Sequence, residues 1–146
     1  MNRTRITTLA ATAAVGTALV VGAATASAQQ RTTTHTLTFR SHQISSTQVG
    51  KAVDVEAHRD IHKGKTIGYD AISCHFDFQA NVAHCRVALA FVNGTMAGRF
   101  SLDGNSGAVR GTIVSGTGAY AGVTGSISGH PGSTQKDAVI TLRYHR

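Results

Sequence analysis

From residue 34 onward, apolar and polar side chains alternate along much of the chain, and Gly-containing turns punctuate the alternation. A period of two is typical of half-buried β-strands, and no stretch has the 3.6-residue period of a long amphipathic helix. Thr, Val, Ser and Gly dominate, whereas Leu, Glu, Lys and Met are scarce. The pattern therefore predicts an all-β protein.

Three tight turns are expected in the middle of the chain, at Lys63-Gly64, Gln79-Ala80 and Asn93-Gly94. Asn-Gly is the strongest hairpin signal of the three. A tight turn fixes which residues face each other across the hairpin, so each turn predicts a strand register. The turns together predict a meander of strands in sequence order.

The three registers agree with one another, because together they give the meander one almost wholly apolar face. The pairs expected on that face include Arg59 with Gly68, Ala57 with Asp70, Asp70 with Leu89, Cys74 with Cys85, and Leu89 with Gly98. The residues expected on the other face are Asp54, Glu56, His58, Tyr69, His75, His84, Arg86 and Arg99.

Further strands are expected at 34–44, 108–115, 123–128 and 138–144. The expected fold is an eight-stranded antiparallel β-barrel formed by residues 35–146 as a single domain, since closure removes the exposed strand edges. A β-sandwich fits the periodicity almost as well.

The N-terminus has the three parts of a secretory signal peptide, assigned to residues 1–28. Arg3 and Arg5 precede an Ala-rich apolar run, which ends in Ala26-Ser27-Ala28. Cleavage is expected between Ala28 and Gln29, leaving residues 29–34 as a polar leader. A membrane anchor is the alternative, but the run is barely long enough to span a bilayer. The mature protein is therefore expected to be secreted and free of the membrane.

The chain is basic, with 14 Lys and Arg against 7 Asp and Glu. These charges are scattered, apart from Arg59, Lys63 and Lys65. A nucleic-acid-binding face would cluster them and add stacking aromatic residues, so no nucleic-acid partner is expected. Solubility and adsorption to acidic surfaces are the simpler consequences.

Cys74 and Cys85 face each other in the expected register, at a separation that a disulfide accepts. Export makes a disulfide the expected outcome. The alternative is a metal site that adds His75 and His84. Neighbouring residues of a strand point to opposite faces, so the four side chains cannot converge, and no metal is expected.

The apolar face of the meander carries two charged residues, Asp70 and Arg59. They are expected to be diagonal neighbours, and Gly98 is expected to leave space beside them. An acid, a cation and a gap on an apolar wall predict a ligand-binding site. The alternative is a structural ion pair. No Ser-His-Asp or Cys-His constellation is apparent, so no catalytic residue is predicted.

Residues 111–125, GTIVSGTGAYAGVTG, are not a phosphate-binding loop, because the Lys-Ser/Thr ending is missing. The segment resembles the "GGTG-aromatic-xx-A-x-G" signature of the dirigent and allene oxide cyclase barrel families, and residues 87–102 are also similar to the dirigent pattern. Three departures are Ser115 in place of Gly, Asp70 near the position of a Cys, and no Arg after Tyr120. No catalytic set is carried over from these families.

The resemblance implies an eight-stranded barrel with a cavity that guides cyclisation or radical coupling of small, mostly apolar molecules without a metal or organic cofactor. Related actinobacterial barrels are polyketide-type cyclases, and the Ala-rich leader suits such a source. The expected function is a secreted barrel that binds a small apolar or aromatic molecule. Three versions stay open: a cofactor-independent cyclase or isomerase, a non-catalytic carrier, and a structural or surface-interaction domain.

Overall fold

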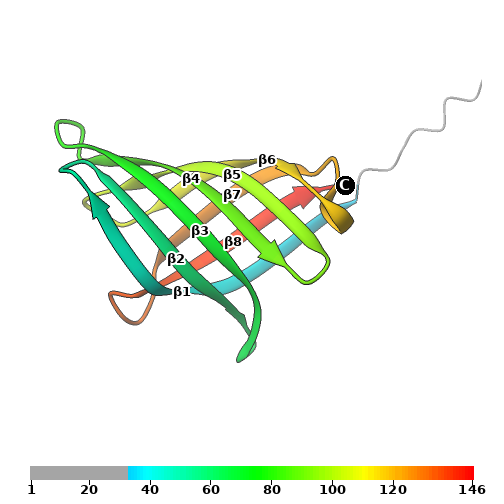
Figure 1. Cartoon of the computed structure of the whole chain (residues 1–146). Helices are drawn as coiled ribbons and strands as arrows, with labels where there is room; N and C mark the ends of the chain where they lie inside the picture. The colour runs from blue at the N-terminus through cyan, green and yellow to red at the C-terminus, as the bar shows by residue number, and fades with distance from the viewer. Residues whose placement is uncertain (1–32) are drawn as a thin grey trace, which may run out of the picture. The chain divides into compact units, whose positions relative to one another are not determined.

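The computed structural model describes residues 33–146, so the expected signal sequence and its cleavage site lie outside the described residues. Eight antiparallel strands follow one another in sequence order and close into a barrel through the β1–β8 pair (Figure 1). The predicted barrel is confirmed, and the closure excludes a sandwich. The elements are β1 (Thr34–Val49), β2 (Val53–His62), β3 (Lys65–Asp77), β4 (Val82–Phe91), β5 (Gly94–Asp103), β6 (Val109–Gly116), the 3₁₀ helix η1 (Gly118–Tyr120), β7 (Thr124–Pro131) and β8 (Asp137–His145).

The core fills the part of the barrel where the inward positions of β4 to β8 are apolar. These side chains alternate with exposed polar ones along each strand, which is the pattern that a barrel wall requires. Among the described residues, no helix is long and apolar enough to cross a membrane. The largest cluster of buried core residues comprises Phe39, Val87, Leu89, Met96, Val109, Ile113, Val123, Ile127, Leu142 and Tyr144.

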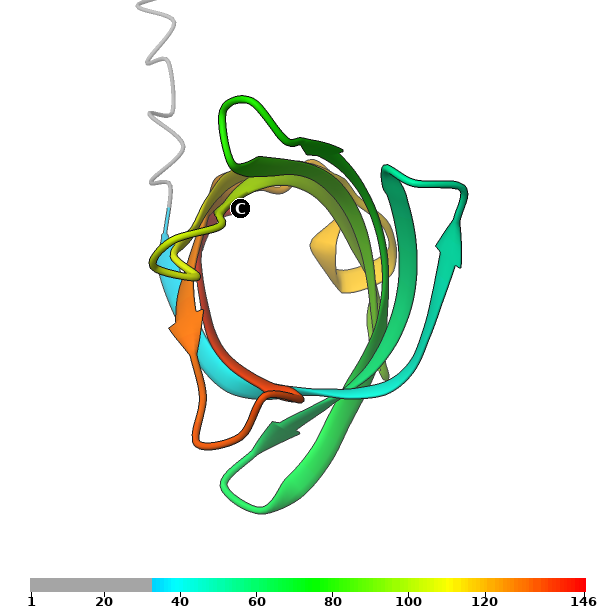
Figure 2. The same cartoon turned by 90° about the vertical axis from the view of Figure 1, so that its left-hand side faces the viewer.

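Aromatic side chains and η1 lie at one end of the barrel. The ring of Tyr120 in η1 lies 5.6 Å from that of Phe91 and 6.0 Å from that of Tyr144, measured between centroids. The bend that carries Tyr120 has glycines of positive φ at both sides, Gly118 at 59° and Gly122 at 74°. Figure 2 looks into the barrel from the opposite end, with η1 at the far side.

Two of the three expected registers place the side chains on the faces that were predicted for them. The β3–β4 register is confirmed, including Asp70 with Leu89 and Cys74 with Cys85. The β4–β5 register is displaced by two residues, because the turn is made by Val92 and Asn93 rather than Asn93 and Gly94. A shift of two leaves every side chain on its expected face.

The β2–β3 register is correct at the turn and wrong beyond it. Lys63 and Gly64 form the turn, with φ of 50° and 77°, and Ile61 faces Thr66 as expected. One extra residue in β3, Ile67, then forms a β-bulge, so that Asp60 faces Gly68. A slip of one residue turns a strand over. The acidic residues and His58 of β2 therefore face the interior, and Arg59 faces outward.

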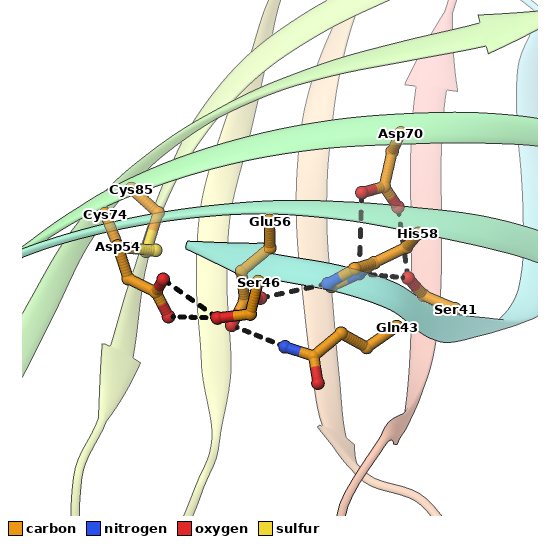
Figure 3. Close-up of polar contacts among 9 residues, drawn as sticks. All are labelled: Ser41, Gln43, Ser46, Asp54, Glu56, His58, Asp70, Cys74 and Cys85. Atoms are coloured by element: carbon orange, nitrogen blue, oxygen red, sulfur yellow. Dashed lines mark hydrogen bonds and ion pairs between the residues drawn. A yellow bond between two sulfur atoms is a disulfide. The ribbon is translucent and has the colours of Figure 1, made fainter. Parts of the chain in front are cut away.

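A disulfide joins Cys74 and Cys85, as predicted, with 4.0 Å between their Cα atoms. It links β3 to β4 on the inner face of the barrel, where both residues are buried. The bond lies beside Asp54, which faces Cys74 across the β2–β3 pair (Figure 3).

Candidate functional site

The interior of the barrel has one polar wall, built by β1, β2 and β3. Ser41 of β1 faces Asp60 of β2, and Gln43 faces His58. His58 in turn faces Asp70 of β3. The bulge at Ile67 creates this wall, because it turns the polar side chains of β2 inward. The strand would otherwise present its valines to the core.

Five side chains of this wall, those of Asp70, Ser41, His58, Glu56 and Gln43, are linked by hydrogen bonds, shown in Figure 3. The hydroxyl of Ser41 donates to Oδ2 of Asp70 at 3.0 Å and lies 2.8 Å from Nδ1 of His58. Nε2 of His58 is 2.9 Å from Oε2 of Glu56, and Gln43 donates to the other Glu56 oxygen at 2.9 Å. The chain therefore runs from Asp70 through Ser41 and His58 to Glu56.

The protonation of the chain follows from its partners. Burial lowers the pKa of His58, but the hydrogen bond to Glu56 and the negative charges of Asp70 and Glu56 outweigh it, so the net shift is upward. The same hydrogen bond lowers the pKa of Glu56. The upward shift favours the protonated form of His58, which would donate from Nδ1 to Ser41 and from Nε2 to Glu56. Ser41 then has its own proton free for Asp70.

Asp70 is the member of the chain with spare bonding capacity. Its Oδ1 atom is buried and has no hydrogen-bond partner among residues 33–146. Burial raises the pKa of Asp70, against the opposing effects of His58, of the neighbouring Asp60 carboxyl and of Ser41. An unpartnered carboxylate oxygen in a dry site is a strong acceptor. It can take a hydrogen bond, or a proton, from a bound molecule.

Asp60 lies behind this chain and is completely buried. Neither of its carboxyl oxygens has a hydrogen-bond partner within the described part of the chain. Burial, reinforced by the negative charge of Asp70, raises the pKa of Asp60 to about 8. Asp60 is therefore neutral at pH 7 and does not repel the charge of Asp70.

The polar wall opens onto a cavity of about 270 Å³. This volume is close to the lower end of the range for small-molecule sites, roughly 300–1,000 Å³. Loop residues of one barrel end, such as Gln135 and Lys136, join the lining, whereas Tyr120 at the other end does not. The polar lining residues on the strands are Ser41, Gln43, Glu56, His58, Asp70 and Asp137, and the apolar ones include Phe39, Ile72, Val87, Leu89, Phe100, Leu102, Val109, Ile127, Ile140 and Leu142.

The structure does not bring the three predicted ligand-binding residues together. Asp70 is buried and lines the cavity. Arg59 is exposed on the outer face opposite Tyr69, so its predicted place on the inner face was wrong. The space expected at Gly98 is already filled, since a Cβ there would lie 2.6 Å from Cδ1 of Ile127 and 2.8 Å from the carbonyl oxygen of Thr112.

His58, Glu56 and Ser41 were missed as site residues by sequence reasoning. The first two were assigned to the outer face, because the register of the turn was extended through the bulge. One signal was available: in β2, acidic residues and His58 alternate with Val53, Val55 and Ala57, and only Arg59 interrupts the pattern. Half of such an alternation must face inward, and Asp70 was already expected there.

The expected histidine pair is present on the outer face, where His75 faces His84. Within residues 33–146 no group of three or more His, Cys, Asp or Glu side chains is placed to hold a metal ion. The predicted absence of a cofactor stays a prediction.

Comparison with known proteins finds structures of similar fold but no match in sequence. No protein-family model matches the chain, and no curated protein matches it in sequence. Solved structures do match. Pyocyanin demethylase superposes with a TM-score of 0.64 at 18% identity, over 75% of this chain and 99% of the other.

Two further matches catalyse different reactions. AbnU, an exo-specific intermolecular Diels-Alderase, has a TM-score of 0.64 at 13% identity, over 78% of this chain and 99% of the other. The pterocarpan synthase dirigent protein PsPTS1 has a TM-score of 0.55 at 14% identity, over 77% and 94%. With its closed antiparallel barrel, the chain therefore has the dirigent/allene oxide cyclase-like barrel fold.

Proposed function

We propose that the protein binds a small, mostly apolar molecule in the barrel cavity and promotes its isomerisation or cyclisation with its own side chains. The observation that carries the proposal is Oδ1 of Asp70, a buried and unpartnered acceptor on the wall of an apolar cavity. Apolar pockets with a few placed polar groups are typical of small-molecule sites. The fold alone supports no particular reaction, because similar barrels are a demethylase and a Diels-Alderase.

The polar wall selects for a donor or a cation on the ligand. The pKa of His58 is shifted upward and that of Glu56 downward, and His58 lies between Glu56 and Asp70. One cationic imidazole between two carboxylates would leave a net negative charge on the wall, which the ligand would meet at Asp70. A bound molecule would place an N–H, O–H or acidic C–H against Asp70 and its apolar part against the opposite wall.

Asp70 has the properties of a general base. Its raised pKa makes it a stronger proton acceptor than an exposed aspartate. The His58 imidazolium, 3.5 Å from Oδ1 of Asp70, would stabilise negative charge that develops on the ligand. An isomerisation balances without a co-reactant, because the proton that Asp70 takes from one atom returns to another.

A ligand-binding test compares 1-naphthylmethylamine with 1-naphthoate, which share a ring system and differ in charge. Fluorescence titration should show about tenfold tighter binding of the amine to the unmodified protein, about 1.4 kcal/mol. Asp70→Asn should remove this preference. Asp77→Asn is the matched control, because Asp77 lies at the end of β3 and accepts hydrogen bonds from its own loop. A lower melting temperature with unchanged binding in Asp70→Asn would discard the site.

A catalytic role needs a second measurement, because a carrier would also bind these probes. 2-Tetralone is a small bicyclic ketone with acidic C–H bonds beside its carbonyl group. In D₂O, NMR should show faster exchange of these hydrogens with the unmodified protein than with Asp70→Asn. Binding without accelerated exchange would support the carrier function instead.

The proposal places the protein outside the cell. Its support is the signal-like order of residues 1–28 together with the disulfide, since disulfides persist in oxidising compartments.

A further inference from the structure

Three arginines gather on the outer wall of the barrel, away from the cavity. Arg86 of β4 faces Arg99 of β5 directly across the strand pair. Arg110 of β6 faces Ser101, so it is a diagonal neighbour of Arg99. All three side chains are exposed. They border a hollow of about 380 Å³, whose lining also includes His84, Ser101 and Thr112.

This arrangement is electrostatically unfavourable in the protein alone. Like charges directly opposite each other destabilise a strand pair. No ion pair or hydrogen bond within the described residues engages the guanidinium groups of Arg86, Arg99 or Arg110. An anion that bridges the three groups would remove this repulsion.

The acidic residues of the chain are placed where they cannot neutralise the arginines. Asp54, Glu56, Asp60 and Asp70 occupy the inward positions of β2 and β3. The remaining three acidic residues lie at the ends of strands and accept hydrogen bonds from the adjoining loops. These are Asp77, Asp103 and Asp137.

We propose that the surface formed by Arg86, Arg99 and Arg110 binds an acidic polysaccharide that carries sulfate or carboxylate groups. Arginine pairs with such groups through two parallel hydrogen bonds. The hydroxyls of Ser101 and Thr112 lie in the same hollow and suit the hydroxyl groups of sugar rings. The proposal is independent of the function of the cavity.

Other polyanions fit the surface less well. Single-stranded nucleic acid is held by aromatic side chains on which its bases stack. Phe100, the aromatic residue in the lining, belongs to the inner face of β5 and packs against the core. An anionic membrane surface also favours apolar side chains that insert beside the charges. The rim of this hollow offers Arg, His, Ser and Thr.

The test measures binding of fluorescent dextran sulfate at about 0.15 M salt, where charges farther apart than about 8 Å are largely screened. The variant is Arg86→Gln, Arg99→Gln and Arg110→Gln combined. Its matched control is Arg59→Gln, Lys63→Gln and Lys65→Gln combined, which removes the same charge from the β2–β3 hairpin. We expect about a tenfold or greater loss in the first triple variant and less than about threefold in the second.

Equal losses in the two triple variants would show that only net charge matters and would overturn the site. Tighter binding of single-stranded DNA or of phosphatidylglycerol vesicles than of dextran sulfate would overturn the assignment of the partner. Uncharged dextran should not bind. If the first triple variant does not fold, Arg99→Gln alone repeats the measurement, because Arg99 lies between the other two arginines.

Discussion

Nδ1 of His58 lies 3.5 Å from Oδ1 of Asp70, across two strands whose register is set by the bulge at Ile67. The imidazolium stands between Asp70 and Glu56, and its other nitrogen is bonded to Glu56. The cation therefore holds two inward carboxylates together.

His58→Gln should destabilise the protein most where both carboxylates are ionised. Gln keeps the hydrogen-bonding capacity but leaves Asp70 and Glu56 without their cation. Breaking a buried pair in this way costs about 3 kcal/mol. Urea unfolding at pH 7 and at pH 4 should show a larger loss at pH 7. An equal loss at both values would indicate a packing effect.

Asp60 should make the protein less stable as the pH rises. Its folded pKa of about 8 lies above the ordinary value of 3.8, so the folded state holds a proton that the unfolded state releases. The free energy of unfolding is therefore highest, as far as Asp60 is concerned, below about pH 4. Between pH 4 and 8 it falls by at most about 1.4 kcal/mol per pH unit. Asp60→Asn should therefore be more stable than the unmodified protein at pH 8.5, with a smaller advantage at pH 5. A constant difference across this range would exclude the titration.

Removal of the disulfide should weaken the barrel without unfolding it. Cys74 and Cys85 close a short loop, so the chain-entropy gain is only about 2–3 kcal/mol. The double change to Ala should lower the free energy of unfolding by that amount and preserve the β-sheet circular dichroism spectrum. Mass spectrometry of unreduced peptides should show the two cysteines linked. Two free thiols in the native protein would refute the pairing.

Gly98→Ala should destabilise the barrel by about 1–3 kcal/mol, because the new methyl group overpacks a filled site. It would meet Ile127 and the backbone oxygen of Thr112. Ile127→Val in the same chain should recover part of the loss, which a double-mutant cycle measures. Unchanged stability in Gly98→Ala would mean that the space first expected at this position exists.

The N-terminus of the secreted protein should be Gln29. Sequencing of material from the culture medium tests this directly. Full-length protein that begins at Met1 and stays in the membrane fraction would contradict the signal peptide and its cleavage after Ala28.

The barrel could be predicted from sequence because the apolar positions of β3, β4 and β5 alternate cleanly and the turns between them are short. The register that pairs Cys74 with Cys85 needed nothing else. The site could not be predicted in the same way. Val53 and Val55 alternate with Asp54 and Glu56. Because interiors are usually apolar, the sequence predicts that the valines face inward. The protein places the acids inside, at the energetic cost expected of a functional site.

The bulge at Ile67 decides this outcome, and two further bulges interrupt β1 and β6; none of the three has a turn residue to mark it. The extra residues are Ile44 in β1, Ile67 in β3 and Val114 in β6. Their β-branched side chains suit an unbroken strand equally well. Only the closure of the whole barrel, with its matched strand lengths and stagger, requires them.

The aromatic cluster around Tyr120 lies at one end of the barrel, and the loop residues that line the cavity lie at the other end. A molecule that enters beside Gln135 and Lys136 would reach Asp70 from the end of the barrel opposite Tyr120. Its leading end would then point toward the aromatic cluster, so the direction of entry would also set its orientation at Asp70. A substituent too large for the cavity can trail into the solvent, and the protein would then discriminate among molecules by their leading ends.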